Sequence, residues 1–411
     1  MIKNYIKIAL KVLGRRKFFT FISLFGISLT LVVLMVVTAI LDNIFTPRQP
    51  ESRFDRVLVM YRVKIFGPDA AMTGAAGYGL LDKYVRPLPS AENISFFTDT
   101  ERAVMYHDGK KLETRVRWTD GAYWQILDFP FLEGGPFTHA DDVNAKQVAV
   151  ISEDMRAKLF GNARALGRSF ELDGRMFRVI GVVPSISVTR INAFGDVWIP
   201  NHTQKNPNWK RQHGGSYNAA VLARSRADFP KLRRELAQNL THYVPADPKV
   251  FTGAEANLDT PFEAFTREVL GEGGRQAATM RAIFVLAALL FMSLATMNLV
   301  SINLSRIMER ASEIGVRKAF GASSRTLIGQ FVVENVVLTL FGGLIGFALS
   351  IFCLRMIAAA DLLPNAMFDI NLRIFAYGML LATIFGIVSG VYPAWRMSRM
   401  QPVNALRGGA L

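Results

Sequence analysis

The segment Arg306–Gly321 reads RIMERASEIGVRKAFG and separates two long apolar stretches of the chain. These stretches are Ala282–Ser305 and Asn335–Leu354, and neither contains a charged residue. At about 1.5 Å per helical residue, each is long enough to cross a hydrocarbon layer of roughly 30 Å. We therefore predict that Arg306–Gly321 is a short charged helix held between two membrane-spanning helices.

Two further stretches without charge, Phe18–Leu41 and Ile374–Trp395, have similar lengths. Apolar residues make up 51% of the chain and the mean hydropathy is +0.23, which is high for a soluble protein. The first stretch could be a signal peptide. It is about twice as long as the apolar core of one, however, and no small-residue cleavage site follows it at residues 41–43. The sequence therefore predicts four transmembrane helices.

The net charge of +15 is concentrated beside the predicted membrane helices. Residues 1–17 contain six basic residues and no acidic one, and further basic residues follow the second and fourth apolar stretches. Because an excess of Lys and Arg marks the cytoplasmic side of a membrane protein, both termini and Arg306–Gly321 are predicted to be cytoplasmic. The charge thus indicates topology and contact with anionic lipid, and it argues against nucleic acid as a partner.

The predicted fold is a membrane protein with four transmembrane α-helices and a large α+β extracytoplasmic domain inserted between helices 1 and 2. We divide the chain into an amphipathic interfacial helix (1–17), transmembrane helix 1 (18–41), the extracytoplasmic domain (42–281) with a β-rich insertion at about 97–185, transmembrane helix 2 (282–305), a cytoplasmic segment (306–329), transmembrane helix 3 (330–358), a short outer loop (359–373), transmembrane helix 4 (374–395) and a cytoplasmic tail (396–411).

Short segments rich in β-branched and aromatic residues recur through the extracytoplasmic domain. Arg56–Ile65 alternates as a strand does, and Phe170–Val183 contains an Asp-Gly pair that is typical of a tight hairpin turn. Glu153–Phe160 is predicted to be a helix. The mixture favours an α+β domain in which the β-rich insertion interrupts a smaller α/β unit.

The chain contains no recognised catalytic motif. Gly161–Ser169 comes nearest to a phosphate-binding loop, but five residues separate its glycines, Arg168 replaces the lysine, and a predicted strand follows it. The five histidines show no metal-ligand spacing, and no GxSxG elbow is present. We therefore expect no catalytic residue, no metal site and no cofactor in this chain.

Two pairs of glycines are spaced four residues apart in the predicted membrane helices. Gly342 and Gly346 lie in the third helix, and Gly386 and Gly390 lie in the fourth. Small residues at this spacing allow the backbones of two helices to approach closely. We predict that these four glycines are helix-packing positions.

Several stretches together resemble the MacB/FtsX-like permease subunits of ABC transporters. FLEGGPF at 131–137, QVAVISE at 147–153 and KLFG at 158–161 are similar to the periplasmic core domain of that family. RASEIGVRKAFGA at 310–322 is similar to its cytoplasmic segment, and YPAWR at 392–396 is similar to its ending. The resemblance covers nearly the whole chain.

The resemblance implies a permease subunit in the bacterial cytoplasmic (inner) membrane that works with a dimer of separate ABC ATPase subunits. ATP and Mg would bind to those subunits. Arg306–Gly321 would be the coupling helix that docks on the ATPase, in which Glu313 and Arg317 form an i,i+4 pair. The coupling residues would be Arg306, Arg310, Glu313, Gly315, Arg317, Lys318 and Gly321.

The resemblance also implies a mechanism and further partners. ATP-driven motion of the membrane helices would move the extracytoplasmic domain (mechanotransmission), and so export or extract a substrate. A second permease subunit, identical or paralogous, and a periplasmic membrane-fusion protein are further candidate partners. The alternative function is an FtsX-type regulator of an extracytoplasmic cell-wall hydrolase. The large extracytoplasmic domain favours transport, since the division-type proteins usually carry a much smaller one.

Overall fold

The computed structural model describes residues 11, 14–15, 17–107, 109–245, 247–271, 275–309, 316, 324–360, 364–366 and 371–398. The chain forms two compact units. The helical unit comprises Met1–Asn43, Thr279–Leu362 and Met367–Leu411, and the external unit comprises Ile44–Ala278 with Leu363–Ala366. The boundary between the units therefore falls near the ends of the predicted extracytoplasmic domain, and four residues of the predicted outer loop belong to the external unit.

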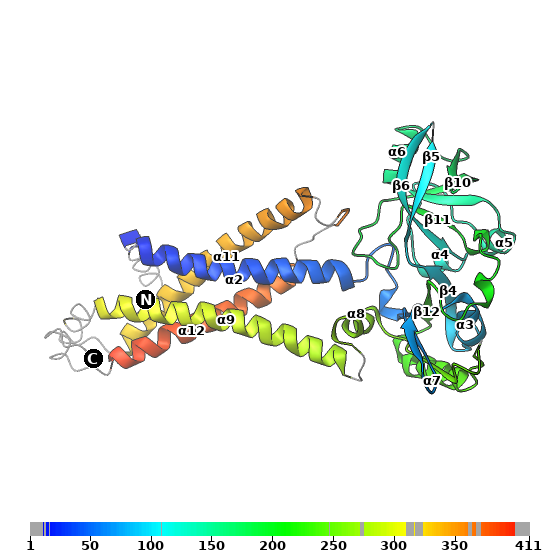
Figure 1. Cartoon of the computed structure of the whole chain (residues 1–411). Helices are drawn as coiled ribbons and strands as arrows, with labels where there is room; N and C mark the ends of the chain where they lie inside the picture. Colours follow the sequence, from blue (N-terminus) through cyan, green and yellow to red (C-terminus); the bar gives the residue numbers. More distant parts are fainter. Residues whose placement is uncertain are drawn as a thin grey trace. The chain divides into compact units, whose positions relative to one another are not determined.

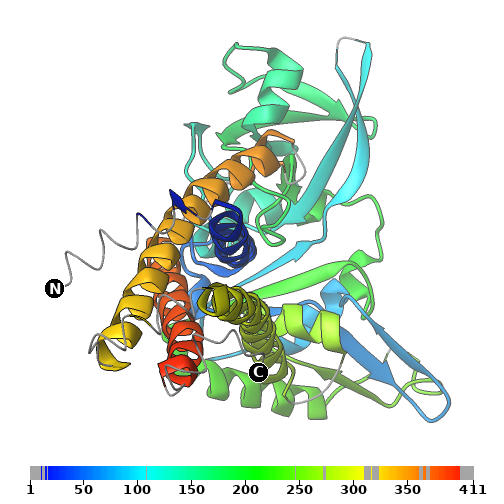
Figure 2. The same cartoon turned by 90° about the vertical axis from the view of Figure 1, so that its left-hand side faces the viewer.

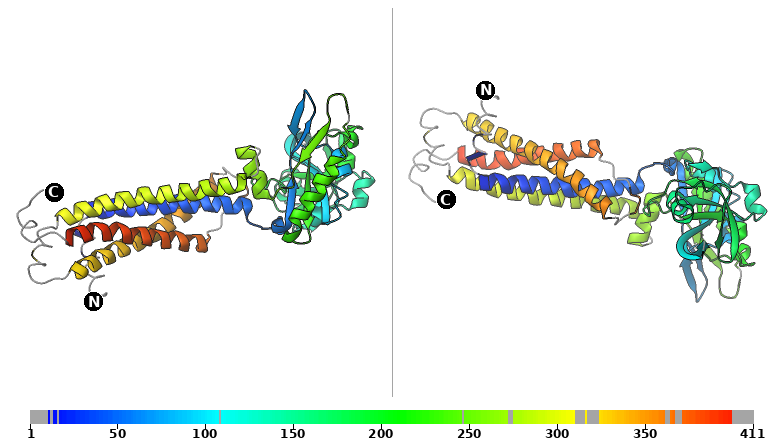
Figure 3. Two further views of the ribbon diagram at one scale, coloured as in Figure 1. Left: turned by 90° about the horizontal axis from the view of Figure 1, so that it is seen from below. Right: turned by 90° about the horizontal axis from the view of Figure 1, so that it is seen from above.

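Long helices make up the described part of the helical unit (Figures 1 and 3): α2 (Lys17–Phe45), α9 (Gln276–Glu309), α11 (Ser324–Ala359) and α12 (Leu372–Ser398). Among the described residues, α2 and the part of α11 from Val332 to Ala359 are long and apolar enough to cross a membrane. The apolar parts found in α9 and α12 are shorter, Gln276–Phe291 and Leu372–Val388. Two of the predicted spans meet this criterion, and the four-span organisation stays a prediction.

A small apolar core joins three of these helices. Ile27 and Leu31 of α2 and Leu338 of α11 are each less than 5% exposed, and Met379 of α12 packs against them. Helices α11 and α12 contact one another over much of their length. Many other apolar side chains of these helices are exposed, among them Phe21, Leu29, Leu344 and Phe352, as lipid-facing residues are.

The external unit contains a ten-stranded mixed sheet and a three-stranded sheet. The large sheet has the order β1-β12-β4-β6-β11-β8-β10-β9-β5, with β7 paired to β10. Its strands are β1 (Val57–Met60), β4 (Ala91–Thr98), β5 (Glu101–His107), β6 (Lys110–Thr119), β7 (Glu133–Gly134), β8 (Val148–Ser152), β9 (Ser169–Leu172), β10 (Arg175–Val183), β11 (Val197–Pro200) and β12 (Tyr217–Ala223). The small sheet has the order β13 (Gly253–Ala256), β2 (Val63–Phe66), β3 (Ala71–Gly74). Figure 2 shows the β5–β6 hairpin in cyan and the β2–β3 hairpin in blue as two separate projections.

Helices cover the sheets of the external unit: α3 (Tyr78–Tyr84), α4 (Tyr123–Ile126), α5 (His139–Val143), α6 (Glu153–Phe160), α7 (Phe229–Thr241) and α8 (Pro261–Leu270). Helix α7 buries one apolar face, formed by Phe229, Leu232, Leu236 and Leu240, in the spacing expected of an amphipathic helix. Four short 3₁₀ segments complete the unit: η1 (Phe54–Arg56), η2 (Asn201–Thr203), η3 (Trp209–Arg211) and η4 (Arg226–Asp228).

The β-rich insertion predicted at about 97–185 is not a separate sheet. Strand β4 belongs to the smaller unit and pairs with β6 of the insertion through one residue pair, Phe97 with Thr119. Arg117 reinforces this narrow connection, because its buried guanidinium donates hydrogen bonds to the carbonyl oxygens of Thr98, Ile191 and Phe194. The two parts therefore share one sheet, and they are held together by these buried polar contacts and by an apolar core in which Val59 and Ala220 pack with Val150 and Trp198.

The prediction of one strand at Arg56–Ile65 is wrong. Residues of this stretch form β1 and β2, which belong to different sheets and are separated by Tyr61 and Arg62. All four residues of β1 are buried because this strand lies between two apolar cores, so its sequence has no polar face to mark its limits. The predicted hairpin is confirmed, since both Asp173 and Gly174 have positive φ, as a type I′ turn requires.

Asp120 forms a buried polar network beside the connection between β4 and β6. Its carboxylate accepts hydrogen bonds from Ser95 Oγ at 2.7 Å, from the Phe96 N–H at 3.0 Å and from the Tyr123 N–H at 3.1 Å. Burial nevertheless raises the pKa of Asp120 to about 6 from an ordinary value of 3.8. The folded chain therefore holds this proton more tightly than the unfolded chain does.

Asp120→Asn should remove a pH dependence of stability. Because the pKa of Asp120 is higher in the folded chain, its contribution to the free energy of unfolding falls as the pH rises from about 4 to about 6. We expect the melting temperature of the wild-type chain in detergent to fall over this range relative to that of Asp120→Asn. A difference between the two that is constant across the range would contradict the assignment.

Candidate functional site

The predicted coupling segment lies largely outside the described residues. Arg306 is part of helix α9, which continues to Glu309, and α11 begins at Ser324. The other predicted coupling residues, Arg310, Glu313, Gly315, Arg317, Lys318 and Gly321, lie outside the described part of the chain, as do most of residues 1–17 and all of residues 399–411. Helix α11 begins three residues after Gly321.

Two of the predicted packing glycines lie on the face of α11 that meets α2. A Cβ atom added to Gly342 would lie 2.9 Å from Ile27 Cβ, and one added to Gly346 would lie 3.1 Å from Leu31 Cβ and from the Ser28 carbonyl oxygen. Ser28 Oγ also donates a hydrogen bond of 2.8 Å to the Gly342 carbonyl oxygen. The two backbones therefore approach so closely that a side chain at either glycine would collide with α2.

A third predicted glycine lies between α11 and α12. A Cβ atom added to Gly386 would lie 2.6 Å from Thr339 Oγ1, and Asn335 and Thr339 are both buried on this side of α11. Gly390 lies within α12, but its surroundings are outside the described residues. The spacing of the glycines predicted packing positions on α11 and α12. It could not reveal that Ser28 on α2 is the hydrogen-bonding partner, because a serine in an apolar helix carries no spacing signal.

Gly342→Leu should separate α2 from α11 and destabilise the helical unit. Overpacking of a tight contact costs about 1–3 kcal/mol, so we expect a lower melting temperature of the chain in lipid nanodiscs. The matched control is Gly329→Leu on the same helix, because no atom of the described residues lies within 4 Å of a Cβ atom added there. Equal losses of stability in the two variants would contradict the proposed role of Gly342.

An aromatic contact fixes the start of the external unit to its last helix. Phe45 is the final residue of α2, and its ring makes edge-to-face contacts with Phe262 and Phe265 of α8, each with 5.2 Å between centroids. Helix α8 begins with a capping box formed by Thr260 and Glu263, which fixes its first turn. The segments by which the chain enters and leaves the external unit are thus packed on one another.

A buried ion pair lies close to this junction in the chain. Glu51, 1% exposed, accepts a hydrogen bond of 2.9 Å from Arg190 Nη1, and the same nitrogen donates to the Thr46 carbonyl oxygen. Burial raises the pKa of Glu51 to about 7, although Arg190 beside it favours the charged form. The pair ties the segment that follows α2 to the loop between β10 and β11.

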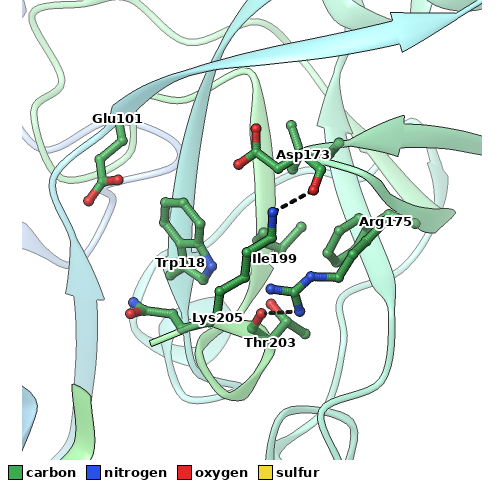
Figure 4. Close-up of a pocket in the computed structure, with 10 residues that line it drawn as sticks. Glu101, Trp118, Asp173, Arg175, Ile199, Thr203 and Lys205 are labelled. Carbon is green, nitrogen blue, oxygen red and sulfur yellow. Dashed lines mark hydrogen bonds between the residues drawn. The ribbon is translucent and has the colours of Figure 1, made fainter. Parts of the chain in front are cut away.

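A small polar cavity of about 190 Å³ lies in the insertion (Figure 4), lined among others by Trp118 of β6, Arg175 of β10 and Lys205. Lys205 Nζ donates to the Asp173 carbonyl oxygen at 2.5 Å, and Arg175 Nη1 donates to the Thr203 carbonyl oxygen at 2.6 Å. The two cations are thus occupied by backbone oxygens, and the volume is below the roughly 300–1,000 Å³ of typical ligand pockets. This cavity has no arrangement of groups suited to catalysis.

Metal binding finds no support in the part of the chain that the structure describes. No group of three or more His, Cys, Asp or Glu side chains is placed there to hold an ion. Two histidines have other contacts: His202 Nδ1 lies 3.1 Å from Asp142 Oδ1, and His213 Nδ1 lies 3.0 Å from Tyr243 Oη.

Comparisons with known proteins identify the family. A model of the MacB-like periplasmic core domain matches residues 20–239, and a model of the FtsX-like permease C-terminal domain matches residues 285–402. The chain is 22% identical over 326 residues to the uncharacterized ABC transporter permease YknZ of Bacillus subtilis, covering 79% of this chain and 77% of YknZ. It is 27% identical over 301 residues to the macrolide export ATP-binding/permease protein MacB of Bdellovibrio bacteriovorus, covering 72% of this chain and 44% of MacB.

A solved structure was also matched. The crystal structure of the extracellular domain of the ABC-type transporter YknZ from Gram-positive bacteria aligns with 48% of this chain and 98% of its own, at 15% sequence identity and a TM-score of 0.37. The two family models together account for most of the chain, in the order in which the sequence motifs occur. The chain therefore belongs to the MacB/FtsX-like family of ABC transporter permeases, which implies an ATPase as its partner.

Proposed function

We propose that this permease converts ATP hydrolysis by a separate ATPase into movement of its external unit, and so exports or extracts a substrate outside the bilayer. The observation that carries the proposal is that α2 is one uninterrupted helix from Lys17 to Phe45. Its apolar part is long enough to cross a membrane, and its last residue packs on α8 of the external unit. A rigid helix of this kind can transmit a displacement from one end to the other.

The contacts of α11 supply the preceding step. In the proposed mechanism, the ATPase docks on Arg306–Gly321 and displaces the start of α11. Because Gly342 and Gly346 leave no space between α11 and α2, displacement of one helix moves the other. The Ser28–Gly342 hydrogen bond and the buried cluster around Leu31 oppose sliding between them.

The junction completes the proposed path into the external unit. Each edge-to-face contact of Phe45 contributes about 0.5–1.5 kcal/mol beyond the area that it buries. The Glu51–Arg190 pair holds the segment that follows α2 to the loop between β10 and β11. The Ile191 carbonyl oxygen of the same loop accepts a hydrogen bond from Arg117. Movement of Phe45 therefore acts both on α8 and on the connection between the two parts of the large sheet.

The remaining features of the proposal follow from the family. The protein would lie in a bacterial cytoplasmic membrane, with both termini inside and the external unit periplasmic or extracellular. It would pair with a second permease subunit, identical or paralogous, above an ATPase dimer that binds ATP and Mg. A periplasmic membrane-fusion protein would join an exporter of this kind.

Reversing charges in the coupling segment should weaken docking of the ATPase. We expect Glu313→Arg and Arg317→Glu each to reduce the amount of co-expressed ATPase that purifies with the chain. Each change would bring a like charge against the oppositely charged groups of the ATPase that the native residue contacts. Lys11→Glu is a matched control for Arg317→Glu, since it makes the same change of charge, from positive to negative, outside the segment. Undiminished co-purification of both segment variants would refute the coupling assignment.

Phe45→Ala should uncouple the external unit from ATP hydrolysis. Hydrogen exchange measured by mass spectrometry on the complex should show a difference between nucleotide-free and vanadate-trapped states in α11 and in α8. We expect Phe45→Ala to retain the difference in α11 and to lose that in α8, while ATP hydrolysis continues. Phe170→Ala removes a buried ring elsewhere in the external unit and should retain both differences.

Two outcomes of this exchange experiment would count against the proposal. One is a wild-type complex in which nucleotide changes the exchange of α11 and leaves the external unit unaffected. The other is a Phe45→Ala complex that behaves as the wild type does. A role as regulator of a cell-wall hydrolase would be recognised by stable binding of such an enzyme to the external unit.

A further inference from the structure

Helix α8 is attached to the external unit by its charged side. With 3.6 residues per turn, its three charged residues and the buried Ala264 lie on one side of the helix. Ala264 belongs to an apolar core of the unit. The charged residues form ion pairs with N···O distances of 2.5–2.7 Å: Glu263 with Arg233 of α7, Arg267 with Asp259, and Glu268 with Arg62. This side of α8 therefore faces the protein.

The opposite side of α8 is apolar. It carries Phe262, Phe265 and Val269 in one stripe, at spacings of three and four residues, with Leu270 beside them in the last turn. Val269 is 56% exposed and Leu270 is 39% exposed. The polar residue on this side, Thr266, is buried, and its hydroxyl donates to a carbonyl oxygen of the same helix at 2.8 Å. The last turn of α8 thus presents exposed apolar side chains.

Two long apolar helices end close to this side of α8. Phe45 is the last residue of α2, which is long and apolar enough to cross a membrane, and its ring packs on Phe262 and Phe265. Five residues separate Leu270 from Gln276, where α9 and its apolar part begin. Because a linker of this length spans at most about 20 Å, the last turn of α8 cannot lie far from the start of α9.

A helix with one charged and one apolar side is suited to a bilayer surface, where its apolar residues enter the boundary between headgroups and acyl chains. We propose that α8 lies on the membrane leaflet that faces the external unit, with Val269 and Leu270 in contact with lipid. Lipid is favoured over a second copy or another protein, because the chain itself holds this end of α8 near the ends of two apolar helices. The contact does not depend on the proposed coupling mechanism.

The test places a fluorescent label on α8 and measures its contact with lipid. The full chain carries Cys353→Ser, which removes its single cysteine, and is labelled with bimane at Val269→Cys. It is placed in nanodiscs of phosphatidylcholine that carries a quenching doxyl group near the head of one acyl chain. We expect strong quenching relative to nanodiscs of the same lipid without doxyl. Leu270→Cys is a second reporter and should behave in the same way.

Two matched positions separate lipid contact from exposure alone. Val143→Cys replaces the same residue type at a similar exposed fraction, 50%, at the end of α5, which Figure 1 shows on the other side of the external unit from α8. Glu268→Cys labels the charged side of α8, one residue before Val269. Quenching at Val269→Cys should be several times that at Val143→Cys and clearly greater than that at Glu268→Cys. The melting temperature of each variant verifies that it is folded.

The proposal is overturned if Val269→Cys is quenched no more than Val143→Cys, whether its label lies in water or is covered by protein. The emission wavelength of bimane distinguishes these two cases. Equal quenching of Val269→Cys and Glu268→Cys would also overturn it, since α8 would then present no particular side to the lipid. Because neither ATP nor ATPase is present, each result is independent of whether the permease couples hydrolysis to movement.

Discussion

Close contact between the backbones of α2 and α11 is the constraint on which the helical unit depends. In lipid, apolar side chains gain little by meeting one another, so helices associate where small residues let backbones approach. Gly342 and Gly346 create that approach, and the hydrogen bond from Ser28 to the Gly342 carbonyl fixes the register. The buried cluster of Ile27, Leu31 and Leu338 lies beside this contact and adds to it.

The external unit is stabilised in a different way. Its apolar cores are extensive, but its two parts share a sheet through one residue pair between β4 and β6. Buried polar side chains lie where β4 pairs with β6. Arg117 donates hydrogen bonds to three carbonyl oxygens, and Asp120 accepts three hydrogen bonds. Such groups are costly to bury and are directional once satisfied, which gives the connection a defined geometry.

The junction at Phe45 carries the proposed path into the external unit. The same ring contacts α8 and lines the largest cavity described in the external unit, and Glu51, six residues later, also lines it.

The sequence by itself determined the apolar stretches, the charge asymmetry, the hairpin at Asp173-Gly174 and the family, because each is a local pattern of composition or spacing. It also predicted Gly342, Gly346 and Gly386 as packing positions, but it could not name Ile27, Ser28 or Thr339 as the residues nearest to them. Only the tertiary structure divided Arg56–Ile65 between two sheets and placed Glu51 against Arg190, 139 positions away in the chain. Periodicity describes which face of an element is buried, and it carries no information about which distant segment covers that face.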